Sequence, residues 1–258
     1  MHLSVIIPAY NEERRLPKTL EEIDKYLSKQ DYDYEIIVVS DGSKDKTAEV
    51  VENLKSKIRN LKLIDNKKNN GKGFVVRQGL MEAKGDFRLF TDADNSTSID
   101  QVEKMWPEFA EALPNLTPRP TSRGSALEKG ADIVIGSRDV KGAVLEPPQP
   151  WLRQVILGEG FKLFRKLIIG LWEVEDTQCG FKCFTKKVAE DIFSKCKINK
   201  FAFDPEILLI AKKMGYKIKE VPVYWKNDLE SKVKFKSILK MALDLFKIRY
   251  YLISRKYD

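Results

Sequence analysis

Two residue patterns alternate along the first 140 residues. Short, nearly continuous apolar runs rich in Val and Ile are separated by longer segments in which apolar residues recur every three or four positions. The first pattern is typical of strands buried on both faces, and the second of amphipathic helices. The expected strands are LSVIIP (3–8), EIIVVS (35–40), LKLID (61–65), FRLF (87–90) and ADIVIGS (131–137).

Helical segments follow the first three of these runs. The expected helices are LPKTLEEIDKYLSK (16–29), DKTAEVVENLKSKI (45–58) and GFVVRQGLMEAKG (73–85), the last ending at Gly85. Alternating strands and helices predict an α/β protein with a mostly parallel sheet covered by helices on both faces. In such sheets, ligands bind outside the carboxyl ends of the strands. Three polar clusters fall at these ends: PAYNE (8–12), SDGSKD (40–45) and TDAD (91–94).

The composition favours a globular protein that binds anions. Of the 258 residues, 43% are hydrophobic, and the formal net charge is +8. This charge favours nucleic acid, phosphorylated ligands or an anionic membrane surface as partners. We do not expect nucleic acid, because the ends of the sheet carry acids. The three cysteines have no metal-ligand spacing, and the Pro- and Ser-rich segment 113–130 is expected to be a surface insertion.

The hydrophobic runs are too short to cross a bilayer. The longest of them, LIIGLW, has about six residues, where a span needs about 20. The N-terminal apolar stretch lacks the length and the basic region of a signal peptide. The sequence therefore predicts a cytoplasmic protein that is soluble or peripheral on the cytosolic face of a membrane.

Two of the polar segments suit a nucleotide. Asp41 follows a buried strand, where its carboxylate can accept from a base N–H or a ribose hydroxyl. The alternative is that Asp41 caps the next helix, but Asp45 fits that role better. In NNGKG, Gly71 and Gly73 flank Lys72 just before a helix, which favours phosphate binding, although a plain turn is the alternative.

Asp92 and Asp94 stand two positions apart directly after a strand. A Mg²⁺ or Mn²⁺ ion that holds a diphosphate needs one or two carboxylates, and D-x-D at a strand end supplies them. The alternative is a solvated acidic turn. The nucleotide-type segments at the same sheet edge favour the metal.

Most of the chain resembles family 2 glycosyltransferases of the GT-A fold, and within them the dolichyl-phosphate β-glucosyltransferases and their prenyl-phosphate relatives. The segments that carry this resemblance are SVIIPAYNEERRL, VVSDGSKDKT, NNGKGFVVRQG, TDAD, IGSR, DTQCGFKCF, FAFDPEIL, and VPVYWKN followed by SKVK. It implies a GT-A sheet and an inverting transfer of a sugar, glucose above others, from a UDP-sugar to a dolichyl or polyprenyl phosphate. The alternatives are a GDP-mannose-dependent mannosyltransferase and a non-catalytic nucleotide-sugar binder.

The resemblance also implies the roles of individual residues. Those expected to bind the nucleotide sugar are Pro8, Tyr10, Asn11, Glu12, Asp41, Lys72, Asp92, Asp204, Glu206 and Lys232. Those expected to face the acceptor phosphate are Ser137, Arg138 and Arg153. The expected catalytic residues are Asp94, Arg138, Asp176 and Gln178, with Asp92 and Asp94 holding Mg²⁺ or Mn²⁺. Asp176 could act as a base or as a positioning residue, and we favour positioning.

We expect a catalytic domain over 1–225 and a basic amphipathic segment over 226–258. The residues assigned to one apolar helical face are Phe235, Ile238, Leu239, Ala242, Leu245, Phe246 and Ile253, opposite Lys236, Lys240 and Lys247. This pattern favours either a helix on an anionic bilayer surface or a helix packed on the core with a solvated basic face. The segment 151–172, with aromatic residues between basic ones, is a second candidate for the membrane surface.

Overall fold

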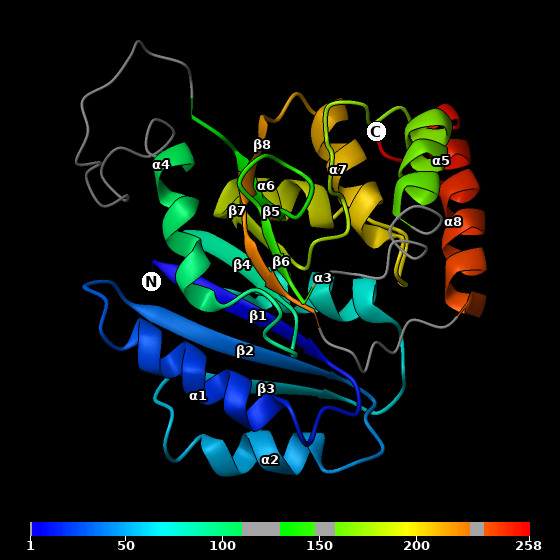
Figure 1. Cartoon of the computed structure of the whole chain (residues 1–258). Helices are drawn as coiled ribbons and strands as arrows, with labels where there is room; N and C mark the ends of the chain where they lie inside the picture. The colour runs from blue at the N-terminus through cyan, green and yellow to red at the C-terminus, as the bar shows by residue number, and fades with distance from the viewer. Residues whose placement is uncertain (1, 110–129, 148–157, 228–234) are drawn as a thin grey trace.

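A seven-stranded sheet forms the centre of the protein (Figure 1). The computed structural model describes residues 2–109, 130–147, 158–227 and 235–258. In spatial order, the strands are β3 (Leu61–Asn66), β2 (Tyr34–Asp41), β1 (Leu3–Ala9), β4 (Phe87–Thr91), β7 (Phe181–Thr185), β5 (Ile133–Ser137) and β8 (Ile218–Pro222). All neighbours pair in parallel except β7, which runs antiparallel to both β4 and β5.

Helices cover both faces of this sheet, as its doubly apolar strands require. One face packs on α1 (Leu16–Leu27), α2 (Thr47–Leu54), the 3₁₀ helix η1 (Ile99–Lys104) and α4 (Trp106–Phe109). The other face packs on α3 (Lys72–Glu82), α6 (Lys186–Phe193) and α7 (Phe203–Lys213). Outside α7 lie α5 (Gly160–Ile169) and α8 (Phe235–Ile253), which pack on each other (Figure 1).

A second, two-stranded sheet pairs β6 (Val144–Glu146) in parallel with β9 (Tyr224–Lys226). It lies beyond the carboxyl ends of the main strands, because Val223 N donates to Ser137 O at the end of β5. Lys226 N also donates to Ser96 O in the loop after β4. This small sheet therefore borders the edge where the polar clusters were expected.

The five predicted strands and three predicted helices are confirmed, although all three helices end earlier than predicted and the second also begins later. The third helix ends at Glu82, and Ala83 is already extended, so Gly85 does not terminate it. A Cβ atom on Gly85 would lie 2.6 Å from Ser4 N. Gly85 is therefore required by close packing against β1 and not by a helix cap.

The predicted single apolar face of the C-terminal helix is wrong. Leu245 and Ile248 are fully buried in the core with α7, whereas Leu239, Phe246 and Ile253 are each more than half exposed. The helix is apolar over two faces, so the pattern alone could not say which face packs inward. None of the described helices combines the length and the hydrophobicity needed to cross a bilayer.

Replacing Leu245 with Ala should lower the free energy of unfolding by about 2–5 kcal/mol, because a fully buried side chain leaves a cavity. The matched control is Leu243→Ala two positions earlier, where the side chain is 55% exposed. That variant should change stability by less than about 0.5 kcal/mol. Urea unfolding of both variants would measure the difference, and equal losses would contradict this orientation of α8.

Candidate active site

The loops that follow β1 and β2 interlock at the carboxyl edge of the sheet. Asn11 N donates to Ser43 Oγ at 3.1 Å, and Lys44 N donates back to Asn11 Oδ1 at 2.8 Å. Glu12 N donates to Thr47 Oγ1 at 2.8 Å, at the start of α2. The predicted meeting of the first two polar clusters is therefore confirmed.

The other residues expected in the first loop are placed around this contact. Pro8 lies near the end of β1, paired with Val39, and Tyr10 beyond it is 40% exposed. The carboxylate of Glu12 is engaged by Arg15, whose Nε and Nη2 donate to it at 2.7 Å each. The exposed Tyr10 ring is thus the part of this loop most open to a ligand.

Asp41 holds the loop that leads into α3. Its Oδ1 accepts from Asn70 N at 2.7 Å and its Oδ2 from Gly71 N at 2.9 Å. Burial raises the pKa of Asp41, although these two N–H groups act to lower it. Asp45 accepts from Thr47 N and so contacts the start of α2, but the N-cap residue of this helix is Lys46 and not Asp45 as expected. Base recognition by Asp41 stays a prediction, to which the structure adds a role in positioning the Lys72 loop.

Lys72 and Asp92 form the centre of the group that the sequence predicts to bind the donor, which we name the donor side. Lys72 Nζ lies 2.6 Å from Asp92 Oδ1. Burial acts to lower the pKa of Lys72, but the carboxylates of Asp92 and Asp204 outweigh it and raise that pKa. Burial and the charge of Asp92 raise the pKa of Asp94, whose Oδ1 accepts from Ser96 N. Three carboxylates thus share one lysine.

A buried ion pair lies beside this group. Lys182 Nζ is 2.6 Å from Asp204 Oδ1, and both residues are buried. Burial raises the pKa of Asp204, against the opposing charges of Lys182 and Lys72. Sequence reasoning did not select Lys182, although it stands in the DTQCGFKCF segment, because a lysine within a strand gives no sign of what it pairs with.

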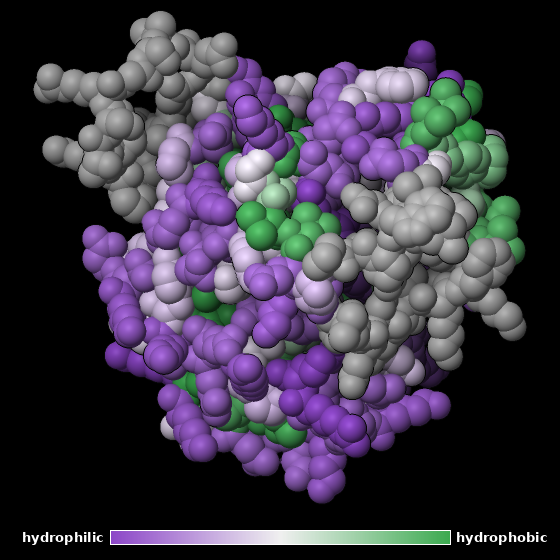
Figure 2. All heavy atoms as spheres, in the orientation of Figure 1, coloured by the Kyte–Doolittle hydropathy of each residue, from purple (hydrophilic) through white to green (hydrophobic). Residues whose placement is uncertain are grey.

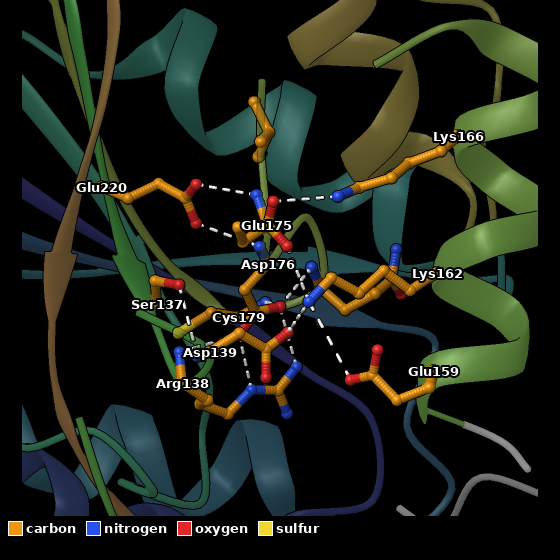
Figure 3. Close-up of polar contacts among 12 residues, drawn as sticks. Ser137, Arg138, Asp139, Glu159, Lys162, Lys166, Glu175, Asp176, Cys179 and Glu220 are labelled. Carbon is orange, nitrogen blue, oxygen red and sulfur yellow. Dashed lines mark hydrogen bonds and ion pairs between the residues drawn. The ribbon is translucent and has the colours of Figure 1, made fainter. Parts of the chain in front are cut away.

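Arg138 and Asp176 form the centre of the group that the sequence predicts to face the acceptor, which we name the acceptor side (Figure 3). Arg138 Nε and Nη2 donate to the two carboxylate oxygens at 2.7 and 3.0 Å. The backbone N–H groups of Arg138, Gln178 and Cys179 donate to the same carboxylate. Burial acts to raise the pKa of Asp176, but the charge and hydrogen bonds of Arg138 lower it well below its usual value. A carboxylate so fully engaged suits positioning better than proton abstraction.

The segment that carries Asp176 is held by two further charged residues that the sequence did not reveal. The carboxylate of Glu220 accepts from the N–H groups of Glu175 and Asp176 at 2.7 and 3.0 Å (Figure 3). Arg165, buried on α5, donates to the carbonyl oxygens of Leu171 and Val174. These contacts join β8 and α5 to one short turn. Glu220 is far from the turn in the sequence, whereas the buried Arg165 is close to it but binds only backbone carbonyl oxygens, which a sequence pattern does not reveal.

Two lysines of α5 extend the positive charge beside Arg138. Lys162 Nζ lies 2.7 Å from the carboxylate of Glu175 and 3.4 Å from that of Asp139, and Lys166 Nζ lies 2.8 Å from Glu175 (Figure 3). Hydrogen bonds from Lys162 and Lys166 lower the pKa of Glu175 to about 2. The acceptor side therefore holds three cations that are matched by carboxylates.

Gln178 offers a donor to a ligand. Within the described residues, its Nε2 atom is buried and meets no hydrogen-bond acceptor. A buried amide of this kind has a cost that a ligand oxygen would relieve. The neighbouring Cys179 is fully buried, and burial raises the pKa of its thiol to about 12, so it is not a nucleophile at neutral pH.

Comparison with known proteins connects this site to a family. Residues 4–120 match the family described as Glycosyl transferase family 2. The chain is 38% identical over 257 residues to a dolichyl-phosphate beta-glucosyltransferase of Trichomonas vaginalis, covering 97% of this chain and 72% of that protein. It is 36% identical over 259 residues to the dolichyl-phosphate beta-glucosyltransferase of Homo sapiens, covering 96% and 74%. The chain belongs to glycosyltransferase family 2.

Solved structures share the fold of this glycosyltransferase. The glucosyl-3-phosphoglycerate synthase of Mycobacterium tuberculosis, solved with Mn²⁺, UDP and glucosyl-3-phosphoglycerate, matches it with a TM-score of 0.63 at 16% identity. The match covers 98% of this chain and 79% of the synthase chain. The expected GT-A fold is confirmed by this likeness and by the mostly parallel sheet.

Some predicted site residues of the glycosyltransferase lie elsewhere. Glu206 is fully buried, and its carboxylate accepts from Lys197 N, Ile198 N and the hydroxyl of Tyr257. It therefore holds a loop and does not join Asp204, although the resemblance puts it beside the donor sugar. The predictions for Arg153, Lys232 and, apart from Gly130, the insertion 113–130 fall outside the described residues.

The pair Asp92 and Asp94 fits a hard divalent cation. Within the described ranges, no group of three or more His, Cys, Asp and Glu residues could enclose a metal. Mg²⁺ and Mn²⁺ need no such cage when a substrate diphosphate and water complete the coordination. The charge of Asp92 contributes to the raised pKa of Asp94, and a cation would relieve this repulsion. The donor set therefore fits a metal that is held jointly with substrate.

Gly180→Ala should displace Asp92, because a Cβ atom on Gly180 would lie 2.1 Å from Asp92 Oδ2. We expect turnover to fall by roughly 10²-fold, the usual cost of misplacing a site residue by about 1 Å. Gly158→Ala is the matched control, because a Cβ atom there meets nothing within 4 Å. Full activity of Gly180→Ala would show that the position of Asp92 is unimportant.

The lowered pKa of Asp176 predicts a specific dependence of stability on pH. Its ion pair stabilises the fold fully above the unfolded pKa of about 3.9 and loses this contribution as the pH falls through the lower folded pKa. Asp176→Asn should therefore be less stable than the wild type by about 3–5 kcal/mol between pH 5 and 8. That gap should shrink only below about pH 4.

Urea unfolding between pH 3 and 8 would measure this gap, with wild type and Asp176→Asn treated in parallel. A gap that already closes between pH 7 and 5 would contradict a lowered pKa for Asp176.

Proposed function

We propose that this glycosyltransferase moves glucose from UDP-glucose to dolichyl phosphate or a related polyprenyl phosphate, with inversion at the anomeric carbon. The similarity to dolichyl-phosphate beta-glucosyltransferases carries the proposal, because it extends over 96–97% of the chain and so includes both sides of the site. The arrangement of charges agrees with a reaction in which both substrates are phosphates.

On the donor side, the open N-terminus of α3 and Lys72 would face the diphosphate of the UDP-sugar. Asp92 and Asp94 would hold Mg²⁺ or Mn²⁺, which would neutralise negative charge on the diphosphate. Lys72 would exchange its contact with Asp92 for a phosphate oxygen. Asp204, already paired with Lys182, would lie beside the sugar.

On the acceptor side, Arg138 would bind the lipid phosphate while Asp176 fixes the plane of its guanidinium group. A phosphate monoester has its second pKa near ~6, so the acceptor is largely ionised at neutral pH. A phosphate oxygen can then attack the anomeric carbon directly, while the bond from that carbon to the diphosphate breaks and UDP leaves. No general base is needed, which agrees with the fully engaged state of Asp176.

The proposed function includes attachment to a membrane surface. Figure 2 shows hydrophobic side chains gathered over α5 and α8. Each is more than half exposed, and they form what we name the α5/α8 apolar face: Leu163, Leu167, Trp172, Leu239, Leu243, Phe246, Tyr250 and Ile253. Phe164 and Phe246 stack edge to face with ring centroids 5.7 Å apart, which joins the two helices. Since α5 also supplies Lys162 to the acceptor side, a prenyl chain lying on this face would have its phosphate near Arg138.

A donor screen tests the proposed reaction. Purified protein should transfer sugar from UDP-glucose to a short prenyl phosphate faster than from GDP-mannose or other UDP-sugars. EDTA should abolish transfer, and Asp94→Asn should lower it by roughly 10²-fold or more without unfolding the protein. NMR of the product should show the β anomer.

Other outcomes of the screen would replace the proposal. Faster transfer from GDP-mannose would make the protein a mannosyltransferase. Binding of UDP-glucose without turnover on any acceptor would make it a nucleotide-sugar binder. Undiminished activity in EDTA would show that the transfer does not need a divalent metal ion.

A further inference from the structure

A basic cavity of about 340 Å³ lies between the loop 197–200 and α8, separate from the site described above. Four lysines and two apolar side chains contribute to its lining: Lys197, Lys200, Lys240, Lys247, Leu243 and Tyr251. The single carboxylate in the lining belongs to Asp244, which is 8% exposed and pairs with Lys247 at 2.8 Å. The cavity therefore has a surplus of three positive charges.

Among the described residues, this surplus of positive charge is not neutralised by carboxylates of the protein. Within the part of the chain that the structure describes, no carboxylate forms an ion pair with Lys197, Lys200 or Lys240. Every cation on the two sides of the active site, by contrast, is matched by a carboxylate. The one carboxylate in the lining, Asp244, is paired with Lys247, so the other three lysines repel one another and an external anion would stabilise them.

The position of the cavity indicates where this anion comes from. Leu243 lines the cavity and is also part of the α5/α8 apolar face. At a bilayer surface, the phosphates of lipid headgroups lie directly above the level at which apolar side chains insert. The protein matches this arrangement, because the lysine-lined cavity lies at the border of the α5/α8 apolar face.

We propose that this lysine pocket binds the phosphate headgroup of an anionic membrane lipid while the α5/α8 apolar face rests in the bilayer. The bound lipid is distinct from the acceptor, because the pocket belongs to α8 and the loop 197–200, whereas Arg138 follows β5. The inference rests on the membrane attachment proposed above. It is independent of the identity of the donor and the acceptor.

Flotation with lipid vesicles tests the pocket without any substrate. The vesicles are phosphatidylcholine alone and phosphatidylcholine with about 30 mol% phosphatidic acid. The pocket variant is Lys200→Glu with Lys240→Glu. The control variant is Lys57→Glu with Lys219→Glu, which makes the same charge change at two other exposed lysines. Lys57 lies in the turn after α2, and Lys219 lies on β8. Thermal unfolding verifies that both variants fold.

We expect wild type and control to float with the acidic vesicles, and the pocket variant to bind them at least about tenfold more weakly, near its level on neutral vesicles. An equal loss in the control would show a general charge effect and overturn the pocket. Unchanged binding of the pocket variant would overturn it as well. Binding of inorganic phosphate by wild type and not by the pocket variant, with equal vesicle binding of the two proteins, would make this a site for free phosphate and overturn the lipid assignment.

The vesicle experiment tests the lipid pocket and the donor screen tests the proposed reaction, so either proposal can be overturned without the other. Loss of vesicle binding in the pocket variant, with unchanged thermal unfolding, would support the pocket. Absence of glucosyl transfer would overturn the proposed reaction without affecting the measured lipid binding.

Discussion

The Asp176 side chain is buried and that of Arg138 mostly so, and removing either partner would leave the other charge uncompensated, at a large cost in stability. Much of the acceptor side is arranged around this pair. Glu220 and Arg165 hold the turn that presents Asp176, and the ring of Trp225 lies 4.7 Å from the guanidinium carbon of Arg138. The pair therefore fixes the direction of an arginine that would otherwise be a long, mobile side chain.

Matched charges recur across the site. Lys72 pairs with Asp92, Lys182 with Asp204, and Lys162 with Glu175. An active site built for two anionic substrates would repel itself if its cations stood alone. Because each of these cations is already paired, the proposed substrate phosphates would have to replace a carboxylate partner in order to bind.

The sheet and the donor side were predictable because they depend on local patterns. Strands buried on both faces are continuous apolar runs, and polar residues at their carboxyl ends must meet, which placed Asn11, Asp41 and Asp92 correctly at one edge. The antiparallel strand β7 was not predicted, because the buried Lys182 among its five residues interrupts the apolar run.

The supporting residues of the acceptor side were not predictable. Glu220 acts on Asp176 across 44 positions, and an unaligned sequence contains no trace of such a contact. The packing of α8 was left open by the sequence, because a helix that is apolar on two faces offers no rule for choosing between burial and exposure. Glu206 was misplaced for a related reason: it shares a helix with Asp204 but lies two positions away, on another face.

Glu206 links two remote parts of the chain. Its carboxylate holds the N–H groups of Lys197 and Ile198, and it also accepts from the hydroxyl of Tyr257, which is 2% exposed. The same loop touches the donor side, because Asn199 O accepts from Phe74 N in the first turn of α3. Tyr257 therefore supports, through Glu206 and the loop 197–199, the backbone at the start of α3 next to Lys72. A change close to Tyr257 would reach the Lys72 loop through these contacts, although the two are far apart in the sequence.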